Sequence, residues 1–169
     1  ILHSGPSCPK EHQIMRTRLN DDIKTAMKSG DKRRLATLRL INAAIKDRDL
    51  NAHVDDQGQA TGLDKIADQD ILALLQKMIK QRRDSIDSYR KGGRDDLADQ
   101  EVDEIAVIEG YLPQQMTEDE IRAAVAGVVE ALNAKGLKDM GRVMAALKEQ
   151  FTGTMDFGKA SGMLKEALK

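Results

Sequence analysis

The chain has 169 residues, 33% of them charged, and a formal net charge of −1, so it is long enough for one or two small domains and is not a basic protein. Aromatic residues make up only 2% and Trp is absent, whereas aliphatic residues and eight Met supply the apolar side chains, which favours packed helices over a β-sandwich or barrel. Because the chain has a single Cys, an intramolecular disulfide framework is excluded. The sequence contains no apolar run long enough to predict a membrane span. We therefore expect a cytoplasmic protein that does not associate with membranes.

The first 14 residues, ILHSGPSCPKEHQI, differ from the rest of the chain. They contain two of the three Pro, two of the three His and the only Cys, and they show no helical period. A secretory signal needs an apolar core of about 7–15 residues, which this stretch lacks. We interpret residues 1–14 as a leader added by cloning or left by processing, with Met15 as the native start.

Two helices are predicted in the first 50 residues. Apolar residues recur at helical spacing up to the Ser29-Gly30 pair, which is typical of a helix end. Asp31 is placed to cap a second helix. The apolar stripe of that helix consists of Leu35, Leu38, Ile41 and Ile45. Because the turn between them is short, the two helices are expected to be antiparallel neighbours, and the polar segment 51–67 is expected to be a loop.

Two further helices are predicted, one between Asp68 and Gly92 and the other from about residue 95 to residue 111. Asp68 is placed as the N-cap of the first, and the pair Gly92-Gly93 closes it. Arg82 is unusual because it lies on the apolar stripe of this helix. Its side chain either extends to the surface along its aliphatic stem or pairs with an acidic residue of the next helix.

Charge is unevenly distributed over these two helices. Residues 77–94 contain seven basic and two acidic residues, whereas residues 95–120 contain ten acidic residues and no Lys or Arg. We expect the two segments to face each other as solvated, mutually attracting surfaces, and the alternative is a nucleic-acid-binding patch on the basic segment. The candidate partner-binding residues on that surface are Lys77, Lys80, Arg83 and Arg90.

Three shorter helices are predicted from Thr117 to the end of the chain. Thr117 and Glu120 have the spacing of a capping box, and Asp139 and Asp156 are placed to cap the other two helices. This segment contains eight basic and eight acidic residues, so it has no net charge that would attract a nucleic acid.

No segment shows the period-2 alternation of a strand, so the predicted class is all-α. Pro113 ends the fourth helix and marks the expected boundary between domains. We expect an N-terminal helical domain over residues 15–112 and a small three-helix domain over residues 117–169.

Patterns for catalysis and metal binding are absent. Outside the leader the chain has one His, His53, and no Cys, so neither a Cys–His dyad nor a zinc cluster can form. No glycine-rich phosphate-binding motif follows a predicted strand. The paired carboxylates of residues 95–104 are interpreted as solvated surface. We expect no metal, no cofactor and no catalytic residue.

A glycine stands inside the predicted helix KDMGRVMAAL, residues 138–147. Gly141 lies in the first turn, just off the apolar face, where it costs about 0.5–1 kcal/mol relative to alanine. Three explanations are open: a ligand approaches the backbone closely, the position simply tolerates glycine, or the close packing of the last two helices requires it.

Four blocks of the sequence carry a family resemblance. They are LNDDIKTAMKSGDKRRLATLRLINAAIKDRDL, LQKMIKQRRDSIDSYRKGGRDDLADQE, EIAVIEGYLPQQMTEDEI and LKDMGRVMAALKEQFTGTMDFGKASGMLKEAL. In order and spacing they resemble the YqeY proteins from Met15 to Lys169. The resemblance implies a two-part, all-helical protein whose C-terminal part is similar to the tail domain of GatB, a subunit of the tRNA-dependent amidotransferase.

The resemblance also implies a partner. In the amidotransferase the tail reaches the outer corner of the tRNA, and its most recognisable stretch corresponds to residues 138–144 here. The candidate nucleic-acid-binding residues are Lys138, Gly141, Arg142, Lys148 and Lys159. We therefore expect a non-catalytic, tRNA-associated binding module, with no DNA partner.

Two alternatives stay open. The chain is a protein-interaction adaptor that binds the translation or aminoacylation machinery through its N-terminal helices, or it is an accessory to a glutamine-dependent carbon–nitrogen ligase. The resemblance implies that ligase assignment, but the sequence has no residue able to carry the reaction.

Overall fold

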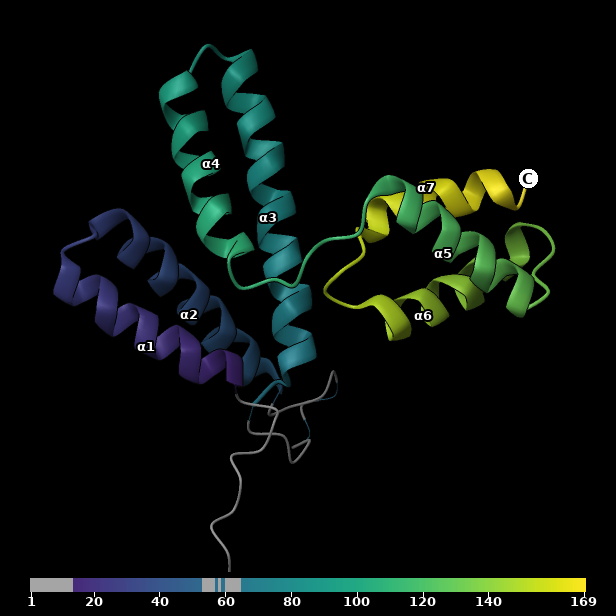
Figure 1. Ribbon diagram of the computed structural model, residues 1–169, viewed down its shortest axis with the longest axis horizontal. Coiled ribbons are helices and arrows are strands. Elements are labelled where there is room, and N and C mark those ends of the chain that lie inside the picture. Colours follow the sequence, from purple (N-terminus) through teal and green to yellow (C-terminus); the bar gives the residue numbers. More distant parts are fainter. Residues whose placement is uncertain (1–13, 53–56, 58, 60–64) are drawn as a thin grey trace, which may run out of the picture. The chain divides into compact units, whose positions relative to one another are not determined.

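The computed structural model describes residues 14–52, 57, 59 and 65–169 (Figure 1). The predicted all-α class is confirmed for this part of the chain, which forms seven α-helices, one short 3-10 helix and no strand. Thirteen of the 14 residues of the predicted leader, His53 and most of the predicted loop lie outside the described residues. None of the described helices is long and apolar enough to cross a membrane.

The chain divides into two compact units, Ile1–Tyr111 and Leu112–Lys169. The first contains two helical hairpins (Figure 1). Their helices are α1 (Ile14–Ser29), α2 (Lys32–Ala52), α3 (Asp68–Lys91) and α4 (Asp95–Glu109).

The turn between α1 and α2 follows the predicted chemistry. Gly30 has a φ of +73°, which glycine adopts without the steric cost of a side chain. The Asp31 carboxylate accepts a hydrogen bond from the N–H of Arg34 at 3.1 Å, so the predicted N-cap is confirmed.

The core of the first unit forms where the two hairpins meet, because α2 contacts both α3 and α4 and α1 contacts α3. Leu38, Ile41 and Ile45 of the predicted stripe are buried, whereas Leu35 is half-buried. The other buried apolar residues are Leu19, Ala26, Ile71, Leu74, Leu75, Met78, Ile79, Ile86, Ala98, Ile108 and Tyr111.

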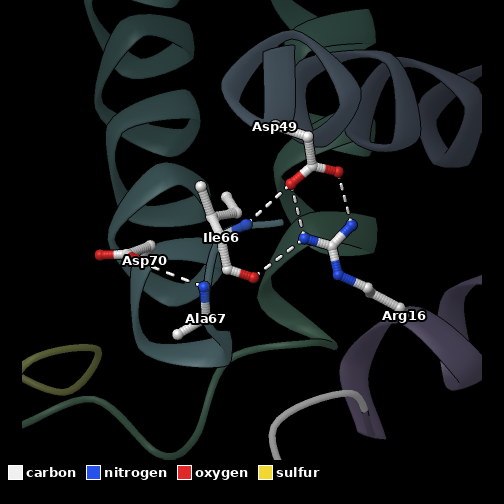
Figure 2. A network of polar contacts seen from close by, with 5 residues as sticks. All are labelled: Arg16, Asp49, Ile66, Ala67 and Asp70. Carbon is white, nitrogen blue, oxygen red and sulfur yellow. Dashed lines mark hydrogen bonds and ion pairs between the residues drawn. The ribbon is translucent and has the colours of Figure 1, made fainter. Parts of the chain in front are cut away.

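The predicted N-cap of α3 is wrong by one residue. Ala67 occupies the cap position, and its N–H donates to the carboxylate of Asp70 at 3.3 Å (Figure 2). Asp68 instead belongs to the first helical turn, where a negative charge favours the helix dipole. An acidic residue suits both positions, so its identity alone does not distinguish them.

Arg82 pairs with α4, and the paired interpretation of this residue is therefore confirmed. Its Nε lies 2.9 Å from Oε2 of Glu104 and 3.9 Å from Oε2 of Glu101. Arg83 lies 3.6 Å from Glu109, so the basic and acidic segments face each other as predicted. Burial and the neighbouring charge of Glu104 raise the pKa of the Glu101 carboxyl.

The second unit is a three-helix cluster. Its three α-helices are α5 (Glu118–Ala131), α6 (Met140–Phe151) and α7 (Phe157–Ala167), and the short 3-10 helix η2 (Leu137–Asp139) precedes α6. Its buried hydrophobic core consists of Ile121, Val125, Val128, Val143, Leu147, Met155, Ala160, Leu164 and Leu168.

Two predicted caps in this unit are confirmed. The Thr117 hydroxyl accepts from the N–H of Glu120 at 3.2 Å, at the start of α5, whereas the Glu120 carboxylate accepts from the Thr117 hydroxyl and not from its N–H, so the cap is present without the reciprocal bond of a capping box. The Asp156 carboxylate accepts from the N–H of Gly158 at 2.9 Å and from that of Lys159 at 3.2 Å, at the start of α7.

Candidate functional site

The start of α6 is built differently from the prediction. Asp139 does not cap α6, because its carboxylate accepts the N–H of Lys135 at 2.8 Å and no hydrogen bond from the helix. The prediction is wrong because the 3-10 turn Leu137–Asp139 runs directly into α6 and leaves Asp139 with helical backbone angles. The carboxylate therefore holds the preceding turn in place.

Arg142 joins the end of α5 to the start of α6. One guanidinium nitrogen donates to the carbonyl of Leu132 at 2.9 Å and lies 3.6 Å from the Asp139 carboxylate. The side chain is 53% exposed, so it also remains accessible to solvent. The i, i+3 spacing of an Asp and an Arg was the available sequence signal for this ion pair.

The packing explanation for Gly141 is wrong. A Cβ added at this position meets no heavy atom within 4 Å, and Gly141 is exposed with φ outside the left-handed region. Contact between α6 and α7 therefore does not require a glycine here. Two explanations remain, close approach of a ligand to the backbone and simple tolerance.

Four exposed residues lie along one side of the η2–α6 segment and form what we call the α6 face: Lys138, Gly141, Ala145 and Lys148. Their i, i+3, i+7, i+10 spacing follows the helical period, and the two Lys lie about 15 Å apart along the helix axis. Neither Lys forms an ion pair with another described residue. The opposite side packs into the core through Val143 and Leu147.

Lys159 lies on α7 and is not part of the α6 face. Its ammonium nitrogen is 3.3 Å from a carboxylate oxygen of Glu118, and both side chains are at least half exposed. Such a surface pair contributes little to stability and exchanges readily with solvent.

The four candidate partner-binding residues all belong to the exposed side of α3, in the first unit. Arg83 pairs with Glu109, as described above. Lys77, Lys80 and Arg90 form no ion pair with a described residue.

A polar network that the sequence did not reveal ties three segments of the first unit together (Figure 2). Two nitrogens of Arg16, on α1, donate to the two carboxylate oxygens of Asp49, on α2, at 2.8 and 2.7 Å. Arg16 also donates to the carbonyl of Ile66 at 2.9 Å, and the N–H of Ile66 donates to Asp49 at 2.9 Å. No short-range pattern connects residues so far apart in the sequence.

The electrostatics of this network follow from its geometry. Burial raises the pKa of the Asp49 carboxyl, but the hydrogen bonds from Arg16 and Ile66 and the charge of Arg16 together hold it below its ordinary value. Asp49 is therefore a carboxylate at neutral pH. These contacts hold the entry of α3 against α1 and α2.

A second unpredicted cluster surrounds the buried Tyr111. Its hydroxyl donates to the carboxylate of Asp22, and the guanidinium carbon of Arg18 lies 4.7 Å from the centre of its ring. Burial and the hydrogen bond to Asp22 raise the pKa of the Tyr111 hydroxyl far above its ordinary range. Arg18 also donates to the carbonyl of Gly110 at 2.8 Å, so this cluster anchors the end of α4 to α1.

Three curated relatives resemble the chain over much of its length. The protein named Altered inheritance of mitochondria protein 41, mitochondrial, of Pyrenophora tritici-repentis is 32% identical over 154 residues, which cover 88% of this chain and 78% of that protein. The protein of the same name from Eremothecium gossypii is 30% identical, with 89% and 78% covered. That from Lachancea thermotolerans is 36% identical, with 68% of this chain and 57% of that protein covered.

These names contradict the predicted cytoplasmic location, since the relatives are mitochondrial proteins. The prediction relied on the single Cys and on the lack of an apolar span. Neither property distinguishes the cytoplasm from an aqueous compartment of a mitochondrion, so composition was an insufficient basis for it.

The family comparison covers both units. The family model described as Yqey-like protein matches residues 16–168, from the first turn of α1 to the residue after α7. The chain therefore belongs to the YqeY-like protein family.

Proposed function

We propose that the second unit is a non-catalytic module that binds tRNA, in the manner that its resemblance to the GatB tail implies. The observation that carries this proposal is the open backbone at Gly141, which lies on the α6 face between two Lys that form no ion pair with a described residue. A glycine that packing does not require is explained if a ligand approaches the peptide there.

The chemistry of the α6 face suits a sugar–phosphate backbone. Without a Cβ at position 141, a ribose or phosphate can come close to the helix surface. Lys138 and Lys148 supply positive charge on either side, and contacts of this kind position a nucleic acid without reading its sequence. Arg142 contributes through its exposed part while it holds the α5–α6 turn.

The test is a titration of the chain against labelled total tRNA at low and at near-physiological salt. We expect saturable binding that weakens as salt rises and that falls in the Lys138→Gln/Lys148→Gln variant. The matched control is Lys77→Gln/Lys80→Gln, which removes the same charge from α3. Equal binding by the α6 variant and the control would contradict the proposal.

A second candidate function is a protein-interaction adaptor. The observation in its favour is the exposure of Leu40 and Leu50 on α2, at 47% and 68%. Docking through apolar side chains changes little with salt, whereas binding to RNA weakens steeply. Salt dependence of partner binding therefore distinguishes the two functions. The third alternative, an accessory to a carbon–nitrogen ligase, has no such observation in its favour.

A further inference from the structure

The turn of the α1–α2 hairpin carries a concentration of positive charge that the proposed tRNA site does not use. Residues 24–34 contain five basic residues and one acidic residue. Four of the basic residues form what we call the basic tip: Lys24, Lys28, Lys32 and Arg33.

The side chains of the basic tip are exposed and hardly neutralised. Lys24, Lys28 and Lys32 form no ion pair with a described residue. Arg33 is 86% exposed and lies 3.0 Å from Asp103, which is itself 57% exposed, so solvent screens this pair.

Two acidic residues of the α1–α2 hairpin, Asp31 and Asp22, are already engaged with other groups. The Asp31 carboxylate accepts the N–H of Arg34 as the cap of α2. The Asp22 carboxylate accepts the hydroxyl of Tyr111 and lies 3.8 Å from Arg34. The positive charge of the tip therefore remains available to a partner.

The four cations flank the turn between α1 and α2 in the sequence. Lys24 and Lys28 are one helical turn apart at the end of α1, and Lys32 and Arg33 are the first two residues of α2. The hairpin can be followed in Figure 1. A Cβ added at Gly30, in the turn itself, meets no heavy atom of the described residues within 4 Å, so none of them packs directly on the turn at this position.

We propose that the basic tip binds the sugar–phosphate backbone of RNA and supplies most of the electrostatic attraction. The choice of RNA rests on the proposed function. The segment from Thr117 to the end has equal numbers of basic and acidic residues, so it attracts a polyanion weakly, and phosphate neutralisation by cations dominates such affinity.

An anionic membrane is the competing partner for a cationic surface. Residues 24–34 expose one large apolar side chain, Met27, at 56%. A helix that lies in a membrane interface needs a wide apolar face, which a single Met does not provide. The observations therefore favour RNA.

The experiment compares two triple variants of the full chain. Lys24→Gln/Lys28→Gln/Lys32→Gln removes three charges from the tip, and Lys77→Gln/Lys80→Gln/Lys91→Gln removes three exposed charges from α3. The probes are labelled total tRNA, a short RNA duplex and vesicles with anionic lipid, each at two salt concentrations. Unchanged thermal unfolding verifies that both variants fold.

We expect the tip variant to bind both RNAs at least about tenfold more weakly than the α3 variant, and the slope of log affinity against log salt to fall by roughly 2–3. Equal RNA affinities for the two variants would overturn the inference. Tip-dependent binding to vesicles without binding to RNA would overturn it as well.

The α6 variant Lys138→Gln/Lys148→Gln separates this inference from the proposed function. If it binds tRNA like the parent chain while the tip variant does not, the proposed function fails and the basic tip stands. If the tip variant binds tRNA like the parent chain while the α6 variant does not, the inference about the basic tip fails and the proposed function stands. A parent chain that binds neither RNA overturns both.

Discussion

Two glycines of this chain, Gly30 and Gly141, occupy positions with different structural requirements. Gly30 stands at a positive φ, where a side chain is strained, whereas Gly141 has helical geometry and open space around it. The backbone conformation therefore favours glycine at the first position and does not at the second. A substitution at Gly141 can therefore distinguish an effect on folding stability from an effect on ligand binding.

We predict that Gly141→Ala raises the free energy of unfolding by up to about 1 kcal/mol, because alanine loses less backbone freedom on folding and meets no neighbour. The same variant should bind tRNA more weakly, because a methyl group then stands between the backbone and its ligand. Urea unfolding and tRNA titration measure the two effects. Higher stability with unchanged binding would show that the position merely tolerates glycine.

Arg82 gives a second prediction at the scale of the residue. Arg82→Met should destabilise the first unit by about 2 kcal/mol, because it leaves the half-buried Glu104 and Glu101 together without a cation. Adding Glu104→Gln to this variant should recover part of the loss. Thermal unfolding of the single and double variants tests this, and a single variant as stable as the parent would contradict the pairing.

At the scale of the element, the Arg16–Asp49 pair connects the start of α1, the end of α2 and the entry of α3 (Figure 2). The folded state holds the pKa of Asp49 below its unfolded value, so Asp49 stabilises the fold above its unfolded pKa. That contribution is lost progressively as the pH falls from about 4, the ordinary pKa of an Asp, through the lower pKa that Asp49 has in the folded state.

We predict that Asp49→Asn is less stable than the parent chain at pH 7 and that the difference shrinks at acidic pH. Asparagine keeps one acceptor for Ile66 but loses the charge that Arg16 pairs with. Urea unfolding at pH values from 7 down to 3 measures the difference. If it stays constant over this range, the ion pair does not contribute to stability.

Local patterns predicted the helices because they depend on neighbours in the sequence. Periodicity located the buried face of α2, and side-chain chemistry located the caps at Asp31, Thr117 and Asp156. The cap at Asp139 was predicted wrongly because the 3-10 turn before α6 has no distinct pattern. The open space at Gly141 could not be predicted, because it depends on which side chains tertiary packing brings near.

At the scale of the whole molecule, the net charge of −1 conceals a strong segregation of charge. The acidic helix α4 neutralises part of the basic surface of α3 through Arg82 and Arg83. The cations of the basic tip have no comparable acidic partner on α1 or α2. The net charge alone speaks against a nucleic-acid partner. The arrangement of the charges does so less, because it leaves exposed basic surfaces.

The second unit has its own core, and this leads to a prediction about independent folding. Nine buried residues from α5, α6, α7 and the connections around them form its cluster, and the caps at Thr117 and Asp156 lie within it. A domain of this size is close to the lower limit for stable folding, so its stability should be modest. We predict that residues 112–169 expressed alone are helical and unfold cooperatively. Circular dichroism during heating measures this, and a fragment without a cooperative transition would show that its fold depends on residues 1–111.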